Sequence, residues 1–240
     1  MPVERKKRTI EIITIFKLIE HEPKRILDLG CGSGEITNVL REHGYNIIGL
    51  DVSPSNCEAA KNRYPQCDFR YYDGLNLPFE ENFFDTVVLN DVFEHISYEH
   101  MDKLIENIKE IVKPGGLIYI SATNRYELIE PHTLIPFITW FPRKFWNIID
   151  KMFNRTGRYR INEIYPYTFR RLKHFCKRHD LKYEDFTYIY VYHKFSDLEY
   201  IGSRALRFLA HLLKKVKLLS LFYHLAYKFS VILFICRVKK

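Results

Sequence analysis

The chain has 240 residues, of which 47% are hydrophobic, 28% are charged and 15% are aromatic. It is long enough for one well-buried domain with insertions, and its apolar and charged fractions exclude a disordered or low-complexity protein. The net charge of +8 is uneven, because residues 1–142 carry 15 Lys and Arg against 22 Asp and Glu, whereas residues 143–240 carry 22 against 7. The basic part is expected to meet nucleic acid, an anionic lipid or a phosphate-bearing substrate, or else to present a solvated basic face.

The cysteines and the apolar runs bear on the compartment. Five cysteines without a C-x-x-C pair argue against a disulfide framework and a thiolate zinc site, and they favour a reducing setting. The apolar run at residues 9–16 is too short for a signal peptide, and Lys228 in the middle of the apolar window 218–238 argues against a spanning helix. We therefore expect a cytoplasmic protein, either free or peripheral on the cytoplasmic face of a membrane.

Helical and extended patterns alternate along the chain. Strands are predicted over residues 25–29, 46–51, 67–72, 84–89, 117–122, 181–191 and 230–238. Helices are predicted over residues 3–21 and 35–43, from Ser53-Pro54 onward, and over 101–112 and 167–179, with a turn at 113–116. This alternation predicts a parallel sheet with helices on both faces. It is interrupted by an aromatic-rich insertion at residues 125–163 and by a helical insertion at residues 197–228.

A glycine-rich loop follows the first predicted strand. Gly30, Gly32 and Gly34 lie between that strand and a helix, where the missing Cβ atoms allow a tight turn and a close approach to a ligand. Glu35 stands where a dinucleotide-binding G-x-G-x-x-G loop needs its third glycine, so the spacing disfavours NAD and FAD. Asp51 ends the second strand, where a carboxylate can accept hydrogen bonds from both hydroxyls of a ribose.

These segments resemble the motifs of class I S-adenosylmethionine-dependent methyltransferases. The matching segments, in chain order, are residues 26–34, 49–53, 72–74, 77–79, 84–90 and 113–116. The resemblance covers roughly residues 25–124 and, more faintly, the last two strands. It implies an α/β fold with a Rossmann-like, doubly wound, seven-stranded sheet whose last strand is antiparallel. It also implies one methyltransferase domain over residues 1–240, with the two insertions forming a lid or a membrane-facing cap.

The resemblance also implies S-adenosylmethionine as the cofactor and a set of residues that bind it. That set comprises Gly30, Gly32 and Gly34 around the methionine and ribose, Asp28 beneath the loop, Asp51 at the ribose, Val52, Asp73 and Gly74 at the adenine, and Asn90 at the amino-acid end. Four strand tips on one edge of a sheet are where such folds bind ligands, so the set is physically coherent.

The residues after the fourth strand carry the chemistry. Methyl transfer from a sulfonium needs a positioned nucleophile and a group that removes its proton. Residues 91–95 resemble the E-x-x-E-H segment of ubiquinone-biosynthesis O-methyltransferases, which has been tied to a divalent metal, with Asp91 replacing the first Glu. Glu94 and His95 are therefore candidates for a base, a metal site or a structural contact, and we assign no metal ligand. His132, in the run Glu-Pro-His, is a rival base.

The insertions bear on the substrate. Residues 134–153 hold both tryptophans beside Arg143 and Lys144, and residues 203–228 form a basic amphipathic stretch. Both insertions could form a lid packed on the sheet, or they could enclose a hydrophobic substrate and touch an anionic bilayer. Arg125 could bind a phosphate or carboxylate group of the substrate.

The expected function is O-methylation of an amphiphilic or lipid-linked small molecule or glycan, with a prenylated quinone precursor as one example. One alternative is methylation of RNA or another nucleic acid by the basic half. Against it, residues 90–93 are not the N-P-P-aromatic run of adenine-N6 enzymes and no Pro-Cys pair is present. The other alternative is a non-enzymatic cofactor-binding or membrane-associated module.

Overall fold

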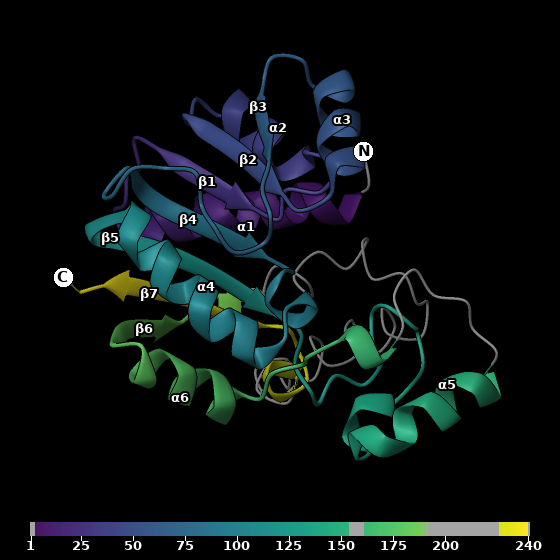
Figure 1. The fold of residues 1–240 in the computed structure, drawn as a ribbon. Helices are drawn as coiled ribbons and strands as arrows, with labels where there is room; N and C mark the ends of the chain where they lie inside the picture. Colours follow the sequence, from purple (N-terminus) through teal and green to yellow (C-terminus); the bar gives the residue numbers. More distant parts are fainter. Residues whose placement is uncertain (1–2, 154–160, 190, 192–225, 240) are drawn as a thin grey trace, which may run out of the picture.

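A single seven-stranded sheet forms the centre of the molecule (Figure 1). The computed structural model describes residues 3–153, 161–189, 191 and 226–239. The strands are β1 (Ile26–Leu29), β2 (Ile47–Asp51), β3 (Asp68–Tyr71), β4 (Phe84–Asn90), β5 (Val112–Ala122), β6 (Leu181–Asp185) and β7 (Ile232–Val238). They lie in the order β3-β2-β1-β4-β5-β7-β6, with β7 antiparallel to both of its neighbours. The implied sheet, with its antiparallel last strand, is confirmed.

The strand order places the ligand edge. The first five strands pair in parallel, so their carboxyl ends meet at one edge, and the order reverses between β1 and β4. A reversal of this kind opens a crevice beyond the carboxyl ends of the two strands. The loops after β1, β2 and β4 therefore meet there, and they carry most of the predicted site residues.

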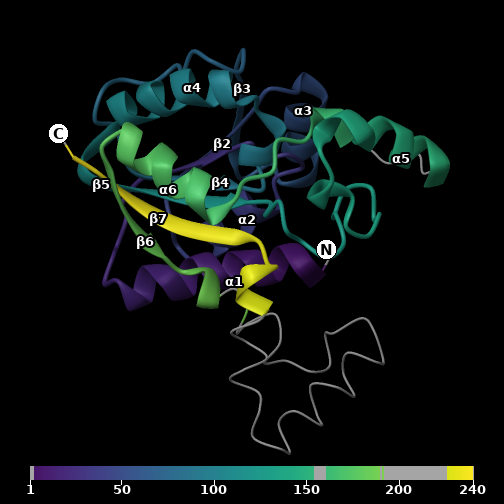
Figure 2. The same ribbon diagram turned by 90° about the horizontal axis from the view of Figure 1, so that it is seen from below.

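Helices cover both faces of the sheet (Figures 1 and 2). They are α1 (Val3–Leu18), α2 (Glu35–Glu42), α3 (Pro54–Arg63), α4 (Tyr98–Ile111), α5 (Trp146–Phe153) and α6 (Phe169–Arg178), with 3-10 turns η1 (Phe93–His95), η2 (Ile138–Trp140), η3 (Arg143–Phe145) and η4 (Ile161–Glu163). The core cluster on one face includes α4 and α6, and the cluster on the opposite face includes α1 and α2. As predicted, the Ser53 side chain caps α3 and Pro54 occupies its first turn.

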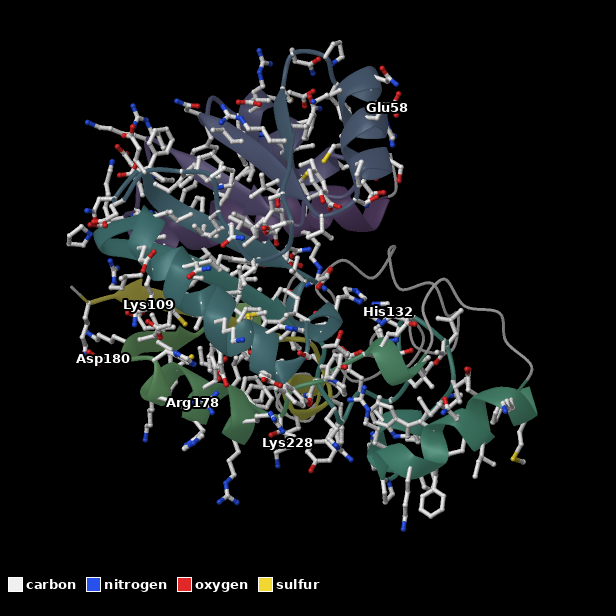
Figure 3. All side chains as sticks on the ribbon, in the orientation of Figure 1. Glu58, Lys109, His132, Arg178, Asp180 and Lys228 are labelled. Atoms are coloured by element: carbon white, nitrogen blue, oxygen red, sulfur yellow. The ribbon has the colours of Figure 1, made fainter. Side chains whose placement is uncertain are left out.

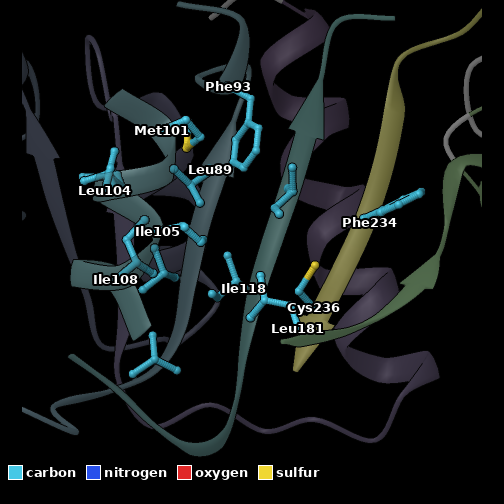
Figure 4. Packing of buried hydrophobic residues seen from close by; sticks show 14 of the residues in the cluster. Leu89, Phe93, Met101, Leu104, Ile105, Ile108, Ile118, Leu181, Phe234 and Cys236 are labelled. Atoms are coloured by element: carbon cyan, nitrogen blue, oxygen red, sulfur yellow. The ribbon is translucent and has the colours of Figure 1, made fainter. Parts of the chain in front are cut away.

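The helix spacing of α4 explains how it holds the site. Met101, Leu104, Ile105 and Ile108 follow the i, i+3, i+4, i+7 pattern and are fully buried in the same cluster as the strands β4 and β5 (Figure 4). Burying each such side chain contributes roughly 1.5–3 kcal/mol. The strand tip that carries Asn90 is therefore supported by a rigid layer.

Two predicted elements differ from the structure. Residues 113–116 bulge out of the pairing between β4 and β5, because Val112 pairs with Phe84 and Leu117 already pairs with Thr86. This agrees with the predicted turn, but the strand β5 begins before the turn, at Val112. The predicted strand 181–191 is wrong beyond Asp185, because residues 187–189 are helical.

The early end of β6 has a local cause. The Asp185 side chain accepts a hydrogen bond from the backbone N–H of Thr187, and the Thr187 hydroxyl accepts one from the N–H of Leu233. Beyond Asp185, these side-chain hydrogen bonds thus replace the backbone hydrogen bonds that would continue the pairing of β6 with β7, and they favour a helical turn.

The first insertion has its own small core. Ile135, Ile138, Trp146, Ile161 and Ile164 are buried together, and α5 projects away from the sheet (Figure 1). Of the second predicted insertion, residues 197–225 lie outside the described residues, and residues 226–228 are helical. Among the helices that the structure describes, none has the length and apolar character needed to cross a bilayer.

Candidate functional site

The glycine loop after β1 forms a cradle. Gly30, Gly32 and Gly34 have φ values of +81°, +54° and +81°, which side-chain-bearing residues rarely adopt. A Cβ on Gly30 would lie 2.4 Å from Val92 Cγ2 and one on Gly34 would lie 2.5 Å from Phe69 Cζ, whereas one on Gly32 would meet nothing within 4 Å. Two glycines therefore allow close packing behind the loop, and Gly32 faces open space.

Two buried carboxylates hold this loop. Asp28 Oδ2 accepts a hydrogen bond of 2.6 Å from the Thr37 hydroxyl, which ties β1 to α2 beneath the loop. Asp51 Oδ2 accepts a hydrogen bond of 2.8 Å from Gly32 N, and Asp51 Oδ1 accepts from Ser53 N. Asp51 Oδ1 also accepts from Asn56 Nδ2, so three of about four acceptor positions of the carboxylate are used and one is left for a ribose hydroxyl.

The predicted adenine residues lie together on the loops after β2 and β3. Val52 is 54% exposed, and a Cβ on Gly74 would lie 3.4 Å from Val52 Cγ1. The Asp73 carboxylate accepts hydrogen bonds from Leu75 N and from the side chain and backbone N–H of Asn76, and these bonds lower the pKa of Asp73. Asp73 is thus ionised and held by its own turn beside an exposed apolar side chain.

Asn90 offers an acceptor at the tip of β4. Its Nδ2 donates to Asp91 Oδ2, whereas its Oδ1 is buried and accepts no hydrogen bond within the described ranges. Buried acceptors are rarely left unsatisfied in folded proteins. An ammonium group such as that of the methionine moiety would satisfy Oδ1, so Asn90, the open space at Gly32 and Asp51 all fit S-adenosylmethionine.

Asp91 binds neighbouring elements together. Its φ is +55°, and its Oδ1 accepts from the Ser121 hydroxyl at 2.7 Å and lies 3.3 Å from Arg8 Nη2. The residues alone do not indicate Arg8, because it lies 83 positions away on α1 and belongs to no motif. Asp91 therefore joins β4, β5 and α1.

Glu94 is a deeply buried acid of the site, with 1% of its surface exposed. Its Oε1 accepts a hydrogen bond of 2.6 Å from the Thr123 hydroxyl, and its Oε2 is buried without a hydrogen-bond partner in the part of the chain that the structure describes. Burial and then the nearby charge of Asp91 raise the pKa of Glu94 to about 7. Glu94 can therefore exchange a proton close to neutral pH.

The two predicted histidines meet beside Glu94. The rings of His95 and His132 lie 4.8 Å apart, edge to face, although 37 residues separate them in the chain. Figure 3 shows His132 on the side of the sheet from which the insertion extends, away from Lys109 and Asp180. Burial and the neighbouring His132 lower the pKa of His95 to about 4, so His95 is neutral at physiological pH.

His132 has an acidic partner to which sequence reasoning assigns no role. Its Nδ1 lies 2.6 Å from Oε1 of Glu130, a 1% exposed carboxylate that also accepts from the backbone N–H of His132 and Thr133. Burial lowers the pKa of His132, but the hydrogen bond and charge of Glu130 outweigh it and the pKa is raised. The signal was the Glu-x-His spacing, which lets the carboxylate orient the ring.

The same three side chains could hold a metal ion. One ligand atom from each of Glu94, His95 and His132 lies within 4.8 Å of the others. A histidine whose second nitrogen meets a carboxylate is common at metal sites. The set differs from the predicted segment Asp91–His95, because His132 replaces Asp91, whose Oδ1 is engaged with Ser121 and Arg8.

Comparisons with known proteins find similarity to methyltransferases. Residues 27–120 match a methyltransferase domain family. The chain is similar to an uncharacterized methyltransferase of Synechocystis sp., with 31% identity over 50% of this chain and 52% of the relative. It is also similar to a ubiquinone biosynthesis O-methyltransferase of Coxiella burnetii, with 31% identity over 42% of this chain and 44% of the relative. The chain spans about half the length of these relatives.

The fold extends over more of the chain than the sequence similarity. Phosphoethanolamine N-methyltransferase 2 of Haemonchus contortus, solved in complex with S-adenosyl-L-methionine, superposes with a TM-score of 0.58 at 19% identity. The match covers 95% of this chain and 52% of that protein. At this identity the likeness shows the fold alone.

We predict that Asp51→Ala weakens binding of S-adenosylhomocysteine by roughly ten- to a hundredfold, since a charge-assisted hydrogen bond contributes about 1.5–3 kcal/mol. Calorimetry on the folded variants measures this. Asp51→Asn, which keeps an acceptor for Gly32 N, should lose less, and Asp68→Ala, an exposed carboxylate on β3, should lose nothing. Unchanged affinity in folded Asp51→Ala would contradict the assignment of Asp51.

We predict a pH-dependent stability that comes from Glu94. Because its folded pKa of about 7 lies above the value of about 4.3 in an unfolded chain, its contribution is full below pH ~4 and is lost as pH rises through 7. Because glutamine cannot ionise, the melting temperature of Glu94→Gln should increase relative to that of the wild type as the pH rises from 5 to 8. Thermal unfolding at stepped pH measures the difference, and exposed Glu99→Gln is the control. A constant difference would contradict the raised pKa.

Proposed function

Because residues 27–120 are a class I S-adenosylmethionine-dependent methyltransferase domain with S-adenosylmethionine as its cofactor, we propose that the chain methylates an oxygen of an amphiphilic or lipid-linked small molecule or glycan. One observation carries the proposal: His132, which Glu130 orients, lies beside Glu94 and His95. Glu94 and His95 belong to the segment that follows Asn90. A hydroxyl nucleophile needs such a base, and the 31% identical ubiquinone biosynthesis O-methyltransferase supports oxygen as the acceptor.

The cofactor, when bound, supplies an electrophilic methyl group on a sulfonium, so the chain's residues have to bind, orient and deprotonate. The Gly32 backbone and Asp51 hold the ribose side, and Asn90 Oδ1 accepts from the amino group. His132 removes the proton of the acceptor hydroxyl through Nε2, while Glu130 at Nδ1 orients the ring and stabilises the imidazolium. Neutral His95 packs on His132, and Glu94 balances the charge of the cluster.

The exposed apolar side chains of the first insertion support the proposed substrate class. In the part of the chain that the structure describes, eleven of the sixteen exposed large hydrophobic side chains lie within residues 126–153. Scattered apolar side chains are normal on a surface, but a concentration of this size marks an interaction site. An acceptor with an apolar tail, delivered from a membrane, would use this surface.

The first test identifies the acceptor and the base. Labelled cofactor is incubated with lipid, glycan and RNA fractions; the proposal expects label in lipid or glycan, and label in RNA alone contradicts it. With the labelled fraction as substrate, His132→Ala should lower turnover by about 10²–10⁴ with unchanged cofactor affinity, and Glu130→Gln should lower it less. Exposed His100→Ala is the control. Inhibition by a chelator, reversed by magnesium, would assign the cluster to a metal instead.

We also propose peripheral association with the cytoplasmic face of an anionic membrane. Ile148 and Met152 lie one turn apart on α5 and are 57% and 77% exposed, and Lys144 and Lys151 are nearby in the chain. Apolar insertion and a contribution of about 1 kcal/mol per basic residue would act together.

Vesicle co-sedimentation tests the membrane proposal. The chain should bind vesicles that contain phosphatidylglycerol, less at high salt, and should bind pure phosphatidylcholine vesicles weakly. Ile148→Ser with Met152→Ser should reduce binding, whereas Leu18→Ser with Tyr71→Ser, which changes exposed apolar residues elsewhere, should not. Equal indifference to both kinds of vesicle would overturn this proposal.

A further inference from the structure

Arginines gather around a pair of tyrosines beside the candidate active site. The rings of Tyr98 on α4 and Tyr165 lie 5.4 Å apart, edge to face. Arg171 Cζ lies 3.3 Å from the centre of the Tyr98 ring, and Arg143 Cζ lies 4.4 Å from the centre of the Tyr165 ring. Aromatic faces hold guanidinium groups while leaving their N–H edges directed elsewhere.

A third arginine joins the group from the end of β5. Arg125 Cζ lies 6.0 Å from the Trp146 ring, whose centre is also 5.4 Å from Arg143 Cζ. Arg125 Nη2 donates to the carbonyl oxygen of Phe141 at 3.3 Å. Three guanidinium groups, from the segment after β5, from η3 and from α6, thus lie against one aromatic cluster.

Two of these arginines have no acidic partner in the part of the chain that the structure describes. Neither Arg125 nor Arg171 has a carboxylate oxygen within 4.0 Å among residues 3–153, 161–189, 191 and 226–239. By contrast, Arg8, Arg63, Arg70 and Arg178 each pair with a carboxylate.

The Tyr98 hydroxyl is not a partner for the charge of these arginines, because it donates a hydrogen bond to the carbonyl oxygen of Pro166. Burial raises the pKa of Tyr98, and the charges of Arg171, Arg143 and Arg125 all act against that rise, so all three cations lie near the Tyr98 hydroxyl.

The arginine cluster adjoins the proposed catalytic residues. The backbone N–H of Tyr165 donates to the carbonyl oxygen of Glu94 at 2.7 Å. Arg125 lies two residues after Thr123, whose hydroxyl donates to Glu94 Oε1. Of the three arginines, Arg171 also lines a cleft of about 730 Å³ along α6. A ligand held by the arginines would therefore lie beside the site and have room to extend.

We propose that Arg125, Arg143 and Arg171 bind a phosphate or diphosphate group carried by the methyl acceptor. This proposal rests on the proposed function and narrows its substrate class to phosphate-bearing amphiphiles. The planar fork of each guanidinium matches two phosphate oxygens, and several guanidiniums suit a group with more than one negative charge. The aromatic ring faces keep the forks in place before the ligand arrives, which lowers the cost of ordering them.

Binding of inorganic pyrophosphate tests the cluster without any knowledge of the full substrate. Titration calorimetry on the full chain, saturated with S-adenosylhomocysteine, should show binding that weakens about ten- to a hundredfold in Arg125→Gln and in Arg171→Gln. Arg171→Lys, which keeps the charge and loses the fork, should fall between. Arg70→Gln, which removes an exposed arginine paired with Asp68 on β3, should bind like the wild type.

The outcomes separate this proposal from the proposed function. No pyrophosphate binding by the wild type, or equal binding by Arg125→Gln and the Arg171 variants, overturns the phosphate site; if Arg171→Gln does not fold, Arg125→Gln and Arg171→Lys decide. Arginine-dependent pyrophosphate binding with no methyl transfer to any fraction supports the site and counts against the proposed function alone. Arginine variants that lose binding to phosphatidylglycerol vesicles but keep pyrophosphate affinity would assign the cluster to lipid headgroups and overturn the substrate site.

Discussion

The burial of Glu94 is the constraint on which the candidate site depends. A carboxylate in an apolar surrounding is stable only when a proton, a cation or several donors compensate its charge, and Thr123 supplies one donor. The remaining compensation has to come from a proton on Glu94 itself, from the His132 imidazolium or from a bound metal ion. Two of these possibilities, the imidazolium and the metal ion, require His132 to lie near Glu94, as it does. The insertion after β5 is therefore part of the site.

The electrostatics divide the site into two regions. The cofactor side is built on carboxylates that accept from backbone N–H groups and hydroxyls, as Asp28 and Asp51 do, and it suits a ligand with a positive sulfonium and a ribose. The other side is built on Arg125, Arg143 and Arg171, which are held by aromatic rings. Glu94 accepts a hydrogen bond from the Thr123 hydroxyl, and its backbone carbonyl accepts one from the backbone N–H of Tyr165, whose ring holds Arg143. A positive cofactor and a negative acceptor would thus approach from differently charged surfaces, which reduces competition between them.

Local patterns predicted most of the fold, and failed where a side chain from elsewhere decided the outcome. The strands from β1 to β5 follow from apolar runs bounded by turn residues, which are local signals. The apolar run 181–191 is equally extended in pattern, but Asp185 and Thr187 bond with their surroundings and end the strand. The helix α5 shows the same limit, since its aromatic residues predict an interface but not the core formed by Trp146 with Ile135 and Ile161.

The sequence by itself determined the cofactor class and predicted the loops that would bind it, because glycine spacing and acidic strand ends are signals over short distances. It also singled out Glu94, His95 and His132 as separate candidates. Only the tertiary structure decided that the two histidines touch, that Glu130 orients one of them, and that Arg8 reaches Asp91 from the first helix. The contacts between the histidines and between Arg8 and Asp91 join residues that are far apart in the chain, so they leave no period or motif in the sequence. The Glu-x-His spacing could have indicated the contact of Glu130 with His132, but its geometry depends on the path of an irregular segment. The arginine cluster is of the same kind, since its three members come from three elements and meet only when the chain is folded.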